Sequence, residues 1–340
     1  MKILEILKLA IDRNASDVIL SPNTRPAIKI DWEIVFLENF EVYEKETLNN
    51  EILSIMNESQ ESRFLKNMEL DFALEVTWLW RFRWNIFMQK NWFWVVFRPI
   101  KSKLQELWLP QRLIDFTKKK SWLIVITWPV WSWKSTTLAT LLEHINYNYR
   151  KHIITVEDPI EYVFGNKKSI IEQREVWINT ENFDNWIKYA LRQSSDVIMV
   201  WEMRDLETFR LALRAAETWN LVLATMHTSW AAESISRIIN MFPNEEKDQI
   251  RTQISEVLIW VAWQMLIKKN WWWRCAAMEL LVNNTTISNM IRKWLNHQID
   301  WVIETWKEDW MITMKKSLEE IYNNWLISEE YLRELQEISL

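Results

Sequence analysis

The stretch from residue 123 to residue 145 constrains the fold of this chain more than any other. It begins with the apolar run Leu123–Ile126, typical of a buried strand, and ends with Leu138–Ile145, whose apolar residues recur at the spacing of one buried helical face. Lys134 and Ser135 lie between these two parts. A phosphate-binding loop requires this order: a buried strand, a loop of the form G-x-x-x-x-G-K-S/T, and a helix whose N-terminus faces the phosphates. The stretch contains every part of the pattern except the glycines.

Trp128 and Trp133 stand at the two glycine positions of that pattern. The backbone N–H groups of such a loop curl around an anion, partly at φ > 0, and an indole would fill the space that the phosphates need. The chain has 26 Trp and 1 Gly, whereas an ordinary protein has about 7% Gly. We therefore hypothesise a translation from a genetic code in which UGA means glycine, so that most of these Trp are Gly. UGG codons at positions 128 and 133 would refute this hypothesis.

Two other stretches support the exchange of tryptophan for glycine. Asp31-Trp32 lies between the alternating segments 27–30 and 34–37, where Asp-Gly is the expected two-residue hairpin turn. Trp271–Trp273 would be an exposed apolar block as written and a flexible turn if glycine.

Length and composition limit the class of protein. The 340 residues suit two domains, with room for a small third, and a net charge of −5 gives no general support for nucleic-acid binding. The single cysteine, Cys275, excludes a disulfide within the chain and fits a reducing compartment. No apolar run approaches the ~20 residues that span a bilayer, and residues 1–14 predict an amphipathic helix rather than a signal peptide. We therefore expect a cytosolic protein without a membrane span.

The order of predicted elements divides the chain into four segments. Residues 1–99 mix helices with alternating strands and predict an α+β domain, and residues 100–112 predict a linker. From 113 to 268 strands and helices alternate, which is typical of a parallel sheet covered by helices. Residues 269–340 predict a helical C-terminal segment after a short strand at 276–282.

Residues 113–268 contain nearly continuous apolar runs, which are typical of strands covered on both faces. Strands are predicted at Leu123–Ile126, Ile153–Val156, Val197–Val200 and Leu221–Met226. Helices are predicted at Phe183–Gln193, Leu206–Glu217, Glu233–Met241 and Glu245–Ile267.

Polar residues follow three of these strands. Glu157-Asp158 follows the second strand, Glu202 follows the third in a Walker B-like ending, and His227 follows the fourth. The carboxyl ends of strands in an open α/β sheet meet at one crevice. Each residue alone is better explained structurally, because acidic residues often cap the next helix and a lone histidine is usually a satisfied buried one. A phosphate loop, an acidic pair, a Walker B ending and a histidine in this order indicate nucleotide hydrolysis instead.

The chain resembles the ATPases of the type II and type IV secretion superfamily, most closely the type IV pilus retraction ATPases of the PilT type. The resemblance covers essentially the whole chain. Besides the phosphate loop, it rests on Ala15–Asp17, Arg81–Arg83, Thr155–Glu161, Gln173–Val176, Glu202–Thr208 and Ala224–Thr228.

The resemblance implies a PAS-like N-terminal domain, a RecA-like P-loop NTPase core, and a ring of six subunits with ATP between neighbours. Ser135 and Glu202 would bind Mg²⁺ together with the nucleotide. The residues implied to hold ATP are Trp128, Pro129, Val130, Trp131, Ser132, Trp133, Lys134, Ser135 and Thr136.

The resemblance also implies catalytic roles. Glu157 is the residue implied to polarise the attacking water, Glu202 supports the metal or the water, and His227 completes the group. Arginines of the N-terminal domain would reach nucleotide phosphate, where a guanidinium neutralises transition-state charge. They are Arg81, Arg83 and Arg98, and each is equally explained as a strand surface residue.

The retraction subtype is favoured because the chain starts at the PAS-like domain and lacks a four-cysteine module. Residues 286–292 keep the apolar spacing and the final arginine of a C-terminal retraction motif. Asn220 and Met278 depart from the family pattern, which has histidines there. The resemblance implies a partner in the inner-membrane pilus platform and a cytoplasmic location at the inner face of the membrane. The alternatives are an assembly or secretion motor, or a nucleotide-dead ring component if the tryptophans are genuine.

Overall fold

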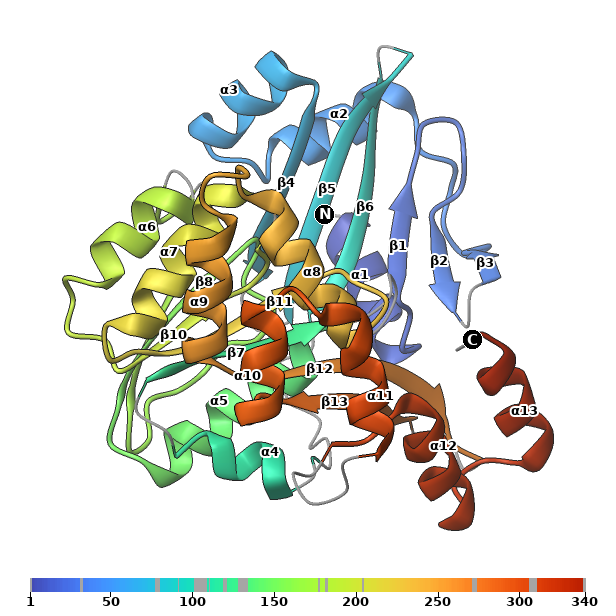
Figure 1. Ribbon diagram of the computed structural model, residues 1–340. Helices are drawn as coiled ribbons and strands as arrows, with labels where there is room; N and C mark the ends of the chain where they lie inside the picture. Colours follow the sequence, from blue (N-terminus) through green and yellow to red (C-terminus); the bar gives the residue numbers. More distant parts are fainter. Residues whose placement is uncertain are drawn as a thin grey trace. The chain divides into compact units, whose positions relative to one another are not determined.

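The computed structural model describes residues 2–30, 33–76, 80–90, 92–100, 109, 111–118, 121–127, 134–176, 178–180, 183–203, 205–270, 274–305 and 311–338. The chain divides into two compact units, each with its own sheet (Figure 1). Unit 1 is Met1–Lys103 with Pro159–Tyr162, and unit 2 is Leu104–Asp158 with Val163–Leu340. The segment boundaries predicted from the sequence stay predictions.

Unit 1 contains a six-stranded antiparallel sheet in the order β3-β2-β1-β6-β5-β4. Its strands are β1 (Asp17–Leu20), β2 (Ala27–Ile30), β3 (Glu33–Phe36), β4 (Glu69–Val76), β5 (Trp80–Gln89) and β6 (Trp92–Ile100). Its helices are α1 (Lys2–Asp12), α2 (Lys45–Leu53) and α3 (Glu58–Asn67). Alternate residues of β5, Phe82, Trp84 and Ile86, are buried, and they join apolar side chains of the three helices in one core.

Unit 2 contains a seven-stranded sheet in the order β13-β12-β7-β11-β10-β8-β9. The strands are β7 (Trp122–Thr127), β8 (His152–Glu157), β9 (Ile170–Glu175), β10 (Val197–Val200), β11 (Leu221–Met226), β12 (Leu258–Lys268) and β13 (Arg274–Val282). All pairs are parallel except β12–β13. This topology agrees with the parallel sheet predicted from the alternation of strands and helices.

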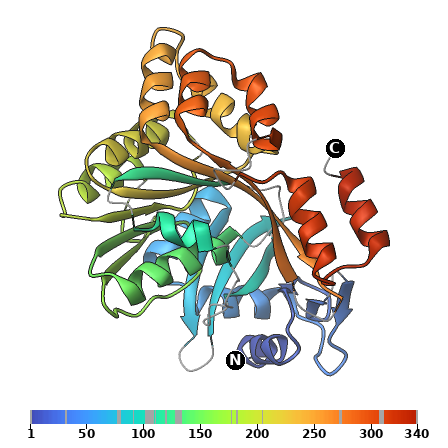
Figure 2. The ribbon, with the colours of Figure 1, turned by 60° about the horizontal axis from the view of Figure 1, so that its bottom comes forward.

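The described helices of unit 2 follow the strands along the chain. They are α4 (Gln111–Phe116), α5 (Lys134–Asn148), α6 (Phe183–Ala190), α7 (Leu206–Glu217), α8 (Ala231–Met241), α9 (Lys247–Val257), α10 (Thr285–Arg292), the 3-10 turn η1 (Asn296–Gln298), α11 (Ile299–Thr305), α12 (Met314–Asn323) and α13 (Glu329–Ile338). Figure 2 shows α12 and α13 beside the long β12–β13 ribbon, against which their apolar side chains pack.

Apolar clusters cover both faces of this sheet. On β7, Leu123 and Val125 belong to a cluster with α6 to α9, whereas Ile124 and Ile126 belong to a second cluster with α5. Successive residues of a strand point to opposite faces, so a strand covered on both sides must be apolar throughout. This requirement explains the continuous apolar run from which the sequence predicted a buried strand.

One predicted helix, Glu245–Ile267, is wrong in its second half. The helix α9 ends at Val257, and the chain continues as β12, which pairs with β7 on one side and β13 on the other. The run from Leu258 is apolar at almost every position, so its periodicity does not separate a buried strand from a buried helix. Neighbouring strands decide its conformation. Strand β9 and helix α11 were not predicted, because β9 is largely polar and α11 has only 7 residues, too few for its period to stand out.

Three tryptophans follow helix ends in the left-handed region that favours glycine. Trp219, Trp294 and Trp325 have φ values of 73°, 58° and 60°. Leu295 N–H donates to Met290 O at 2.9 Å and Trp294 N–H to Ile291 O at 3.2 Å, which is the Schellman pattern of a helix C-terminus. The same two bonds occur at the end of α12: Leu326 N–H donates to Ile321 O at 3.2 Å and Trp325 N–H to Tyr322 O at 2.8 Å.

These helix ends are unsuited to a bulky residue. The left-handed conformation costs a side-chain-bearing residue about 1–2 kcal/mol, a cost that glycine avoids. The indole of Trp325 is 83% exposed and that of Trp219 is 78% exposed, so neither recovers this cost by burial.

A second group of tryptophans is buried instead of exposed. Trp84, Trp186, Trp260 and Trp263 are buried, and within the described residues their indole N–H groups have no hydrogen-bond acceptor. A buried donor without an acceptor costs about 1–3 kcal/mol. The exposed tryptophans therefore occupy positions where an indole is costly, and the buried ones each leave an indole N–H unsatisfied.

Among the described helices, none combines the length and apolar character needed to cross a membrane.

Candidate active site

The carboxyl ends of β8, β10 and β11 are level with one another. Val200 on β10 pairs with Val156 on β8 and with Ala224 on β11. The chain after β10 is held between its neighbours, because Trp201 N–H donates to Val156 O at 3.1 Å and Met203 N–H donates to Thr225 O at 2.9 Å. Glu157, Glu202 and His227 therefore emerge at one edge of the sheet, as the sequence predicted.

The strand that leads into the phosphate loop is fixed to the same edge. Thr127 ends β7, and its hydroxyl accepts from Thr228 N–H at 3.0 Å and donates to Thr228 O at 3.1 Å. The Thr228 hydroxyl in turn lies 2.5 Å from the Ser234 hydroxyl on α8. These buried contacts tie the residue before the loop to the turn after His227. The sequence analysis missed Ser234, since nothing in its context distinguishes it from an ordinary helical serine.

The loop residues Trp128, Pro129, Val130, Trp131, Ser132 and Trp133 lie outside the described residues. Lys134 and Ser135 begin α5, and their side chains also lie outside the described part of the chain. Thr136 is buried. The next residue, Thr137, donates from its hydroxyl to Gln264 Oε1 on β12 at 2.5 Å, which anchors the start of the helix to the sheet.

Glu157 is the most buried of the predicted catalytic residues, with 1% of its surface exposed. Its Oε1 accepts two hydrogen bonds, from Thr155 Oγ1 at 2.7 Å and from Gln173 Nε2 at 3.1 Å. The Gln173 amide is fixed from its other end, where Oε1 accepts from Phe164 N–H at 2.8 Å. The two neutral donors hold one carboxylate oxygen in place. The sequence identified Gln173 only as part of a motif, and its contact with Glu157 depends on the pairing of β8 with β9.

Glu202 and His227 lie next to each other. Glu202 Oε1 is 3.3 Å from His227 Nε2, and the carboxylate is the more buried of the two side chains. The carbonyl of His227 accepts from Arg237 Nη1 on α8 at 2.5 Å, which fixes the turn that carries the imidazole. Because β11 lies between β7 and β10, His227 emerges between the phosphate-loop strand and the Walker B strand.

Asp205 and Asn220 have structural roles in the described contacts. Asp205 is the N-cap of α7, where its carboxylate accepts from Thr208 N–H at 2.8 Å. Asn220 precedes β11, so the length of the strand separates it from His227 by roughly 20 Å. Its amide contacts Ser195 Oγ at 2.9 Å. The replacement of a histidine at position 220 therefore does not disturb the Glu202–His227 pair.

The predicted arginines belong to unit 1. Arg83 Nε donates to Asp71 Oδ1 at 3.1 Å and Nη2 donates to Asp71 Oδ2 at 2.5 Å, in a bidentate pair that joins β5 to β4. Arg98 Nε donates to Asp17 Oδ1 at 2.9 Å. Arg81 lies on β5, and its guanidinium Nε is buried. Arg83 and Arg98 thus each have a carboxylate partner within their own unit. The role of the three arginines at a nucleotide stays a prediction.

The described residues contain no group of three or more His, Cys, Asp or Glu side chains that could hold a metal ion.

Comparison with known proteins gives a consistent result. A family model described as "Type II/IV secretion system protein" matches residues 105–299. The chain is 39% identical over 341 residues to the type IV pilus retractation ATPase PilT of Pseudomonas aeruginosa, with 99% of each protein covered. It is 38% identical over 319 residues to a twitching motility protein of Neisseria gonorrhoeae, which covers 89% of this chain and 85% of that protein.

Solved structures agree with the sequence comparison. A crystal structure of the pilus retraction motor PilT with bound ADP matches with a TM-score of 0.90 at 39% identity, covering 98% of this chain and 96% of that one. The Legionella pneumophila ATPase DotB matches with a TM-score of 0.83 at 23% identity, covering 99% and 96%, and supports the fold alone. The predicted α/β fold class is confirmed. The chain belongs to the type II/IV secretion system family and, within it, to the type IV pilus retraction ATPases.

Proposed function

We propose that this chain is the subunit of a homohexameric motor that hydrolyses ATP and powers pilus retraction. The observation that carries the proposal is the convergence of Glu157, Glu202 and His227 beside the strand that leads into Lys134 and Ser135. The family membership supplies the reaction class, and the names of the relatives, a retraction ATPase and a retraction motor, support retraction.

The site residues have different roles in phosphoryl transfer. Lys134 and the N-terminus of α5 neutralise phosphate charge, and Ser135 with Glu202 would hold Mg²⁺, which would supply charge stabilisation at the phosphates. Glu157 accepts a hydrogen bond from the attacking water and orients it. Because Thr155 and Gln173 both bond to Glu157 Oε1, the carboxylate needs little reorganisation when the water binds.

His227 keeps Glu202 in place through the 3.3 Å contact between them. Its turn is joined to β7 through Thr127 and Thr228, so a change at the phosphate loop reaches α8 through a short set of buried contacts. We propose that this connection transmits the state of the nucleotide. Arg81, Arg83 and Arg98 act at a nucleotide phosphate when subunits close in the ring.

The proposal requires glycine at positions 128 and 133, and we infer that the translated protein carries it. The support comes from Trp294 and Trp325, which stand at the left-handed position of two Schellman motifs, and from buried indoles without acceptors. Peptide mass spectrometry of the protein purified from its natural host should find glycine at 128, 133, 294 and 325. Tryptophan at 128 and 133 would favour the nucleotide-dead ring component.

ATPase measurements on protein with glycine at these positions test the enzyme. We expect hydrolysis that depends on Mg²⁺ and on Glu157. Well-formed hexamers that bind no nucleotide would contradict the proposal.

Gene deletion tests the direction of the motor. We propose that the ring acts at the cytoplasmic face of the inner membrane on the pilus platform protein, and that it withdraws pilin subunits. Loss of a retraction motor leaves cells with surface pili in excess. Bald cells would instead indicate an assembly motor, and normal pili with a secretion defect would indicate a secretion motor.

A further inference from the structure

Strand β3 presents apolar side chains to solvent at an edge of the unit 1 sheet. Ile34 is 57% exposed, Phe36 is 56% exposed, and Val35 between them is also exposed. Within the described part of the chain, β3 pairs with β2 and with no other strand. An edge strand of this kind usually carries lysine, proline or a bulge that prevents pairing with another chain. The residues of β3 include neither lysine nor proline.

The backbone of β3 has hydrogen-bonding groups on its open side. Leu37 N–H donates to Pro26 O at 2.8 Å, which identifies one bonded position at the end of the β2–β3 ladder. Bonded positions alternate along an antiparallel pair, so Val35 and Glu33 bond to β2. Ile34 and Phe36 therefore direct their N–H and C=O groups away from β2. These are the groups that an added strand would bond.

The segment around this edge is strongly acidic. From residue 33 to residue 51 the sequence has Glu33, Glu38, Glu41, Glu44, Glu46 and Glu51, against one basic residue, Lys45. All of these glutamates are exposed except Glu51, which is partly buried. The Lys45 ammonium lies over the Trp92 ring, 4.5 Å from its centroid. The surface thus combines exposed apolar residues with a net negative charge.

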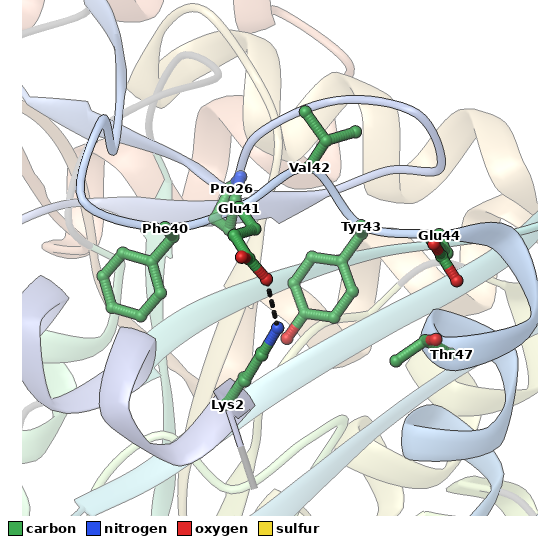
Figure 3. Close-up of a pocket in the computed structure, with 8 residues that line it drawn as sticks. All are labelled: Lys2, Pro26, Phe40, Glu41, Val42, Tyr43, Glu44 and Thr47. Carbon is green, nitrogen blue, oxygen red and sulfur yellow. Dashed lines mark hydrogen bonds and ion pairs between the residues drawn. The ribbon is translucent and has the colours of Figure 1, made fainter.

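A pocket lies beside the end of β3 (Figure 3). Its volume is about 260 Å³, and it is lined by Lys2, Pro26, Phe40, Glu41, Val42, Tyr43, Glu44 and Thr47. Pro26 also accepts the hydrogen bond from Leu37, the residue directly after β3, so the pocket and the end of the β2–β3 ladder share a residue. Glu41 Oε2 lies 3.2 Å from Lys2 Nζ, but both side chains are mostly exposed, and such a pair is weak.

The pocket itself suits a cation. The rings of Phe40 and Tyr43 and the carboxylates of Glu41 and Glu44 surround it. Tyr43 bonds to Glu51 Oε2 at 3.2 Å, and burial together with that carboxylate raises the pKa of the phenol, which keeps it neutral. A lysine or arginine side chain that replaces the Lys2 ammonium at Glu41 would therefore meet aromatic faces and two carboxylates.

We propose that β3 binds an extended segment of a partner protein in which apolar residues alternate with lysine or arginine. The segment adds a strand to the sheet through the backbone of Ile34 and Phe36, and one basic side chain enters the pocket. A second β3 from another copy of this chain would bring the same glutamates together and would be repelled. The charge of the surface therefore favours a partner other than a symmetric copy.

A pair of synthetic peptides tests the proposal on the full-length protein. One peptide alternates valine with lysine, and the other alternates valine with glutamate. We expect the lysine peptide to bind, with an affinity that falls as salt rises, and to protect the amides of Ile34 and Phe36 from hydrogen exchange. The amides of the other edge strand, β4, should remain as they are without peptide.

Variants separate strand addition from general attraction to an acidic protein. Ile34→Pro removes an outward N–H without removing a bond to β2, and we expect it to weaken binding at least tenfold relative to Ile34→Ala. Glu41→Gln with Glu44→Gln should weaken the lysine peptide and leave the valine–glutamate peptide unbound. Equal binding of the two peptides, or equal affinities of the two Ile34 variants, would overturn the proposal.

Hydrogen exchange of the hexamer without peptide is the remaining control. If the amides of Ile34 and Phe36 become protected on hexamer formation without peptide, a neighbouring subunit occupies the edge and the proposed partner is wrong.

Discussion

Two sheet edges in this protein differ in which groups they bury and which they expose. At the first, which we name the nucleotide edge, the carboxyl ends of β8, β10 and β11 carry Glu157, Glu202 and His227, whose side chains are buried or partly buried and hydrogen-bonded. At the second, the open edge, β3 exposes apolar side chains and unbonded backbone beside exposed carboxylates. The polar groups of the nucleotide edge are already positioned to stabilise charge. The open edge instead exposes apolar surface and backbone groups that another chain could cover.

The difference shows what each edge can bind. Fixed dipoles around a buried carboxylate stabilise charge without reorganisation, which suits a reaction at a phosphate. Exposed apolar area and open backbone groups gain free energy only when another chain covers them. Substitutions that conserve shape but change charge should therefore damage the nucleotide edge, whereas substitutions that remove a backbone donor should damage the open edge.

The largest effect is expected at Glu157. Glu157→Gln keeps the shape of the side chain and removes the carboxylate, and we expect ATP hydrolysis to fall on the order of 10²–10⁴-fold while the hexamer is retained. Steady-state hydrolysis and analytical ultracentrifugation measure both quantities. Glu172→Gln on the adjacent strand β9 is the matched control, because that side chain is about half exposed. Equal rates for the two variants would remove Glu157 from the mechanism.

A buried carboxylate of unit 2 should also differ from the exposed ones of the open edge in its response to pH. Glu279 on β13 accepts from Ala231 N–H at 2.9 Å, and burial, with a smaller effect of Asp300, raises its pKa from 4.5 to about 7. The folded state therefore binds more protons than the unfolded state between these values, so its stability falls as pH rises from 4.5 to 7. The loss is on the order of 3 kcal/mol above pH 7.

Urea unfolding of the wild type and of Glu279→Gln from pH 5 to pH 8 measures this loss. The variant should gain stability relative to the wild type as pH rises. Glu41→Gln at the open edge is the control and should show no such trend. A difference between wild type and Glu279→Gln that is constant over this range would contradict the assignment.

The two edges should also respond differently to proline. Val35→Pro removes a bond of β3 to β2, and we expect it to lower the free energy of unfolding of unit 1 by about 3 kcal/mol. Ile34→Pro, whose N–H faces outward, should cost less than about 1 kcal/mol. Chemical denaturation followed by circular dichroism compares them. Similar losses would mean that the register inferred for β3 is incorrect.

The Glu202–His227 pair should be energetically coupled. Each single variant, Glu202→Gln and His227→Asn, should slow hydrolysis, and the double variant should lose less than the product of the two effects. We expect a coupling energy of about 1–2 kcal/mol in kcat/KM, as for other side chains in contact. Strictly multiplicative effects would show that the 3.3 Å contact has no role in the reaction.

The smallest catalytic effect is expected at Gln173, which orients Glu157 without contacting substrate. Gln173→Leu should lower kcat at least about tenfold and leave KM for ATP nearly unchanged, since one hydrogen bond to a charged group is worth roughly 1.5–3 kcal/mol. Thr155→Val removes the other donor to the same oxygen and should act similarly. A change in KM alone would indicate nucleotide binding rather than positioning.

The departures from prediction have physical causes. The apolar run after Leu258 was predicted as helix, because a segment apolar at almost every position has no period that distinguishes a buried strand from a buried helix. Gln173 was identified without a role, because its contact with Glu157 exists only when β9 pairs with β8. Ser234 has no distinguishing signal in the sequence at all. In each case the missing information was the identity of a neighbour distant along the chain.

The sequence by itself determined that strands and helices alternate through most of unit 2, which residue types follow the strands, and the anomaly of tryptophan at glycine positions, because these follow from spacing, residue type and composition. Only the tertiary structure decided which polar groups meet. It placed His227 against Glu202 and Gln173 against Glu157, it left β3 open, and it put Trp294 and Trp325 at left-handed helix ends. Strand order and register determine which distant residues come together, and local sequence does not encode them.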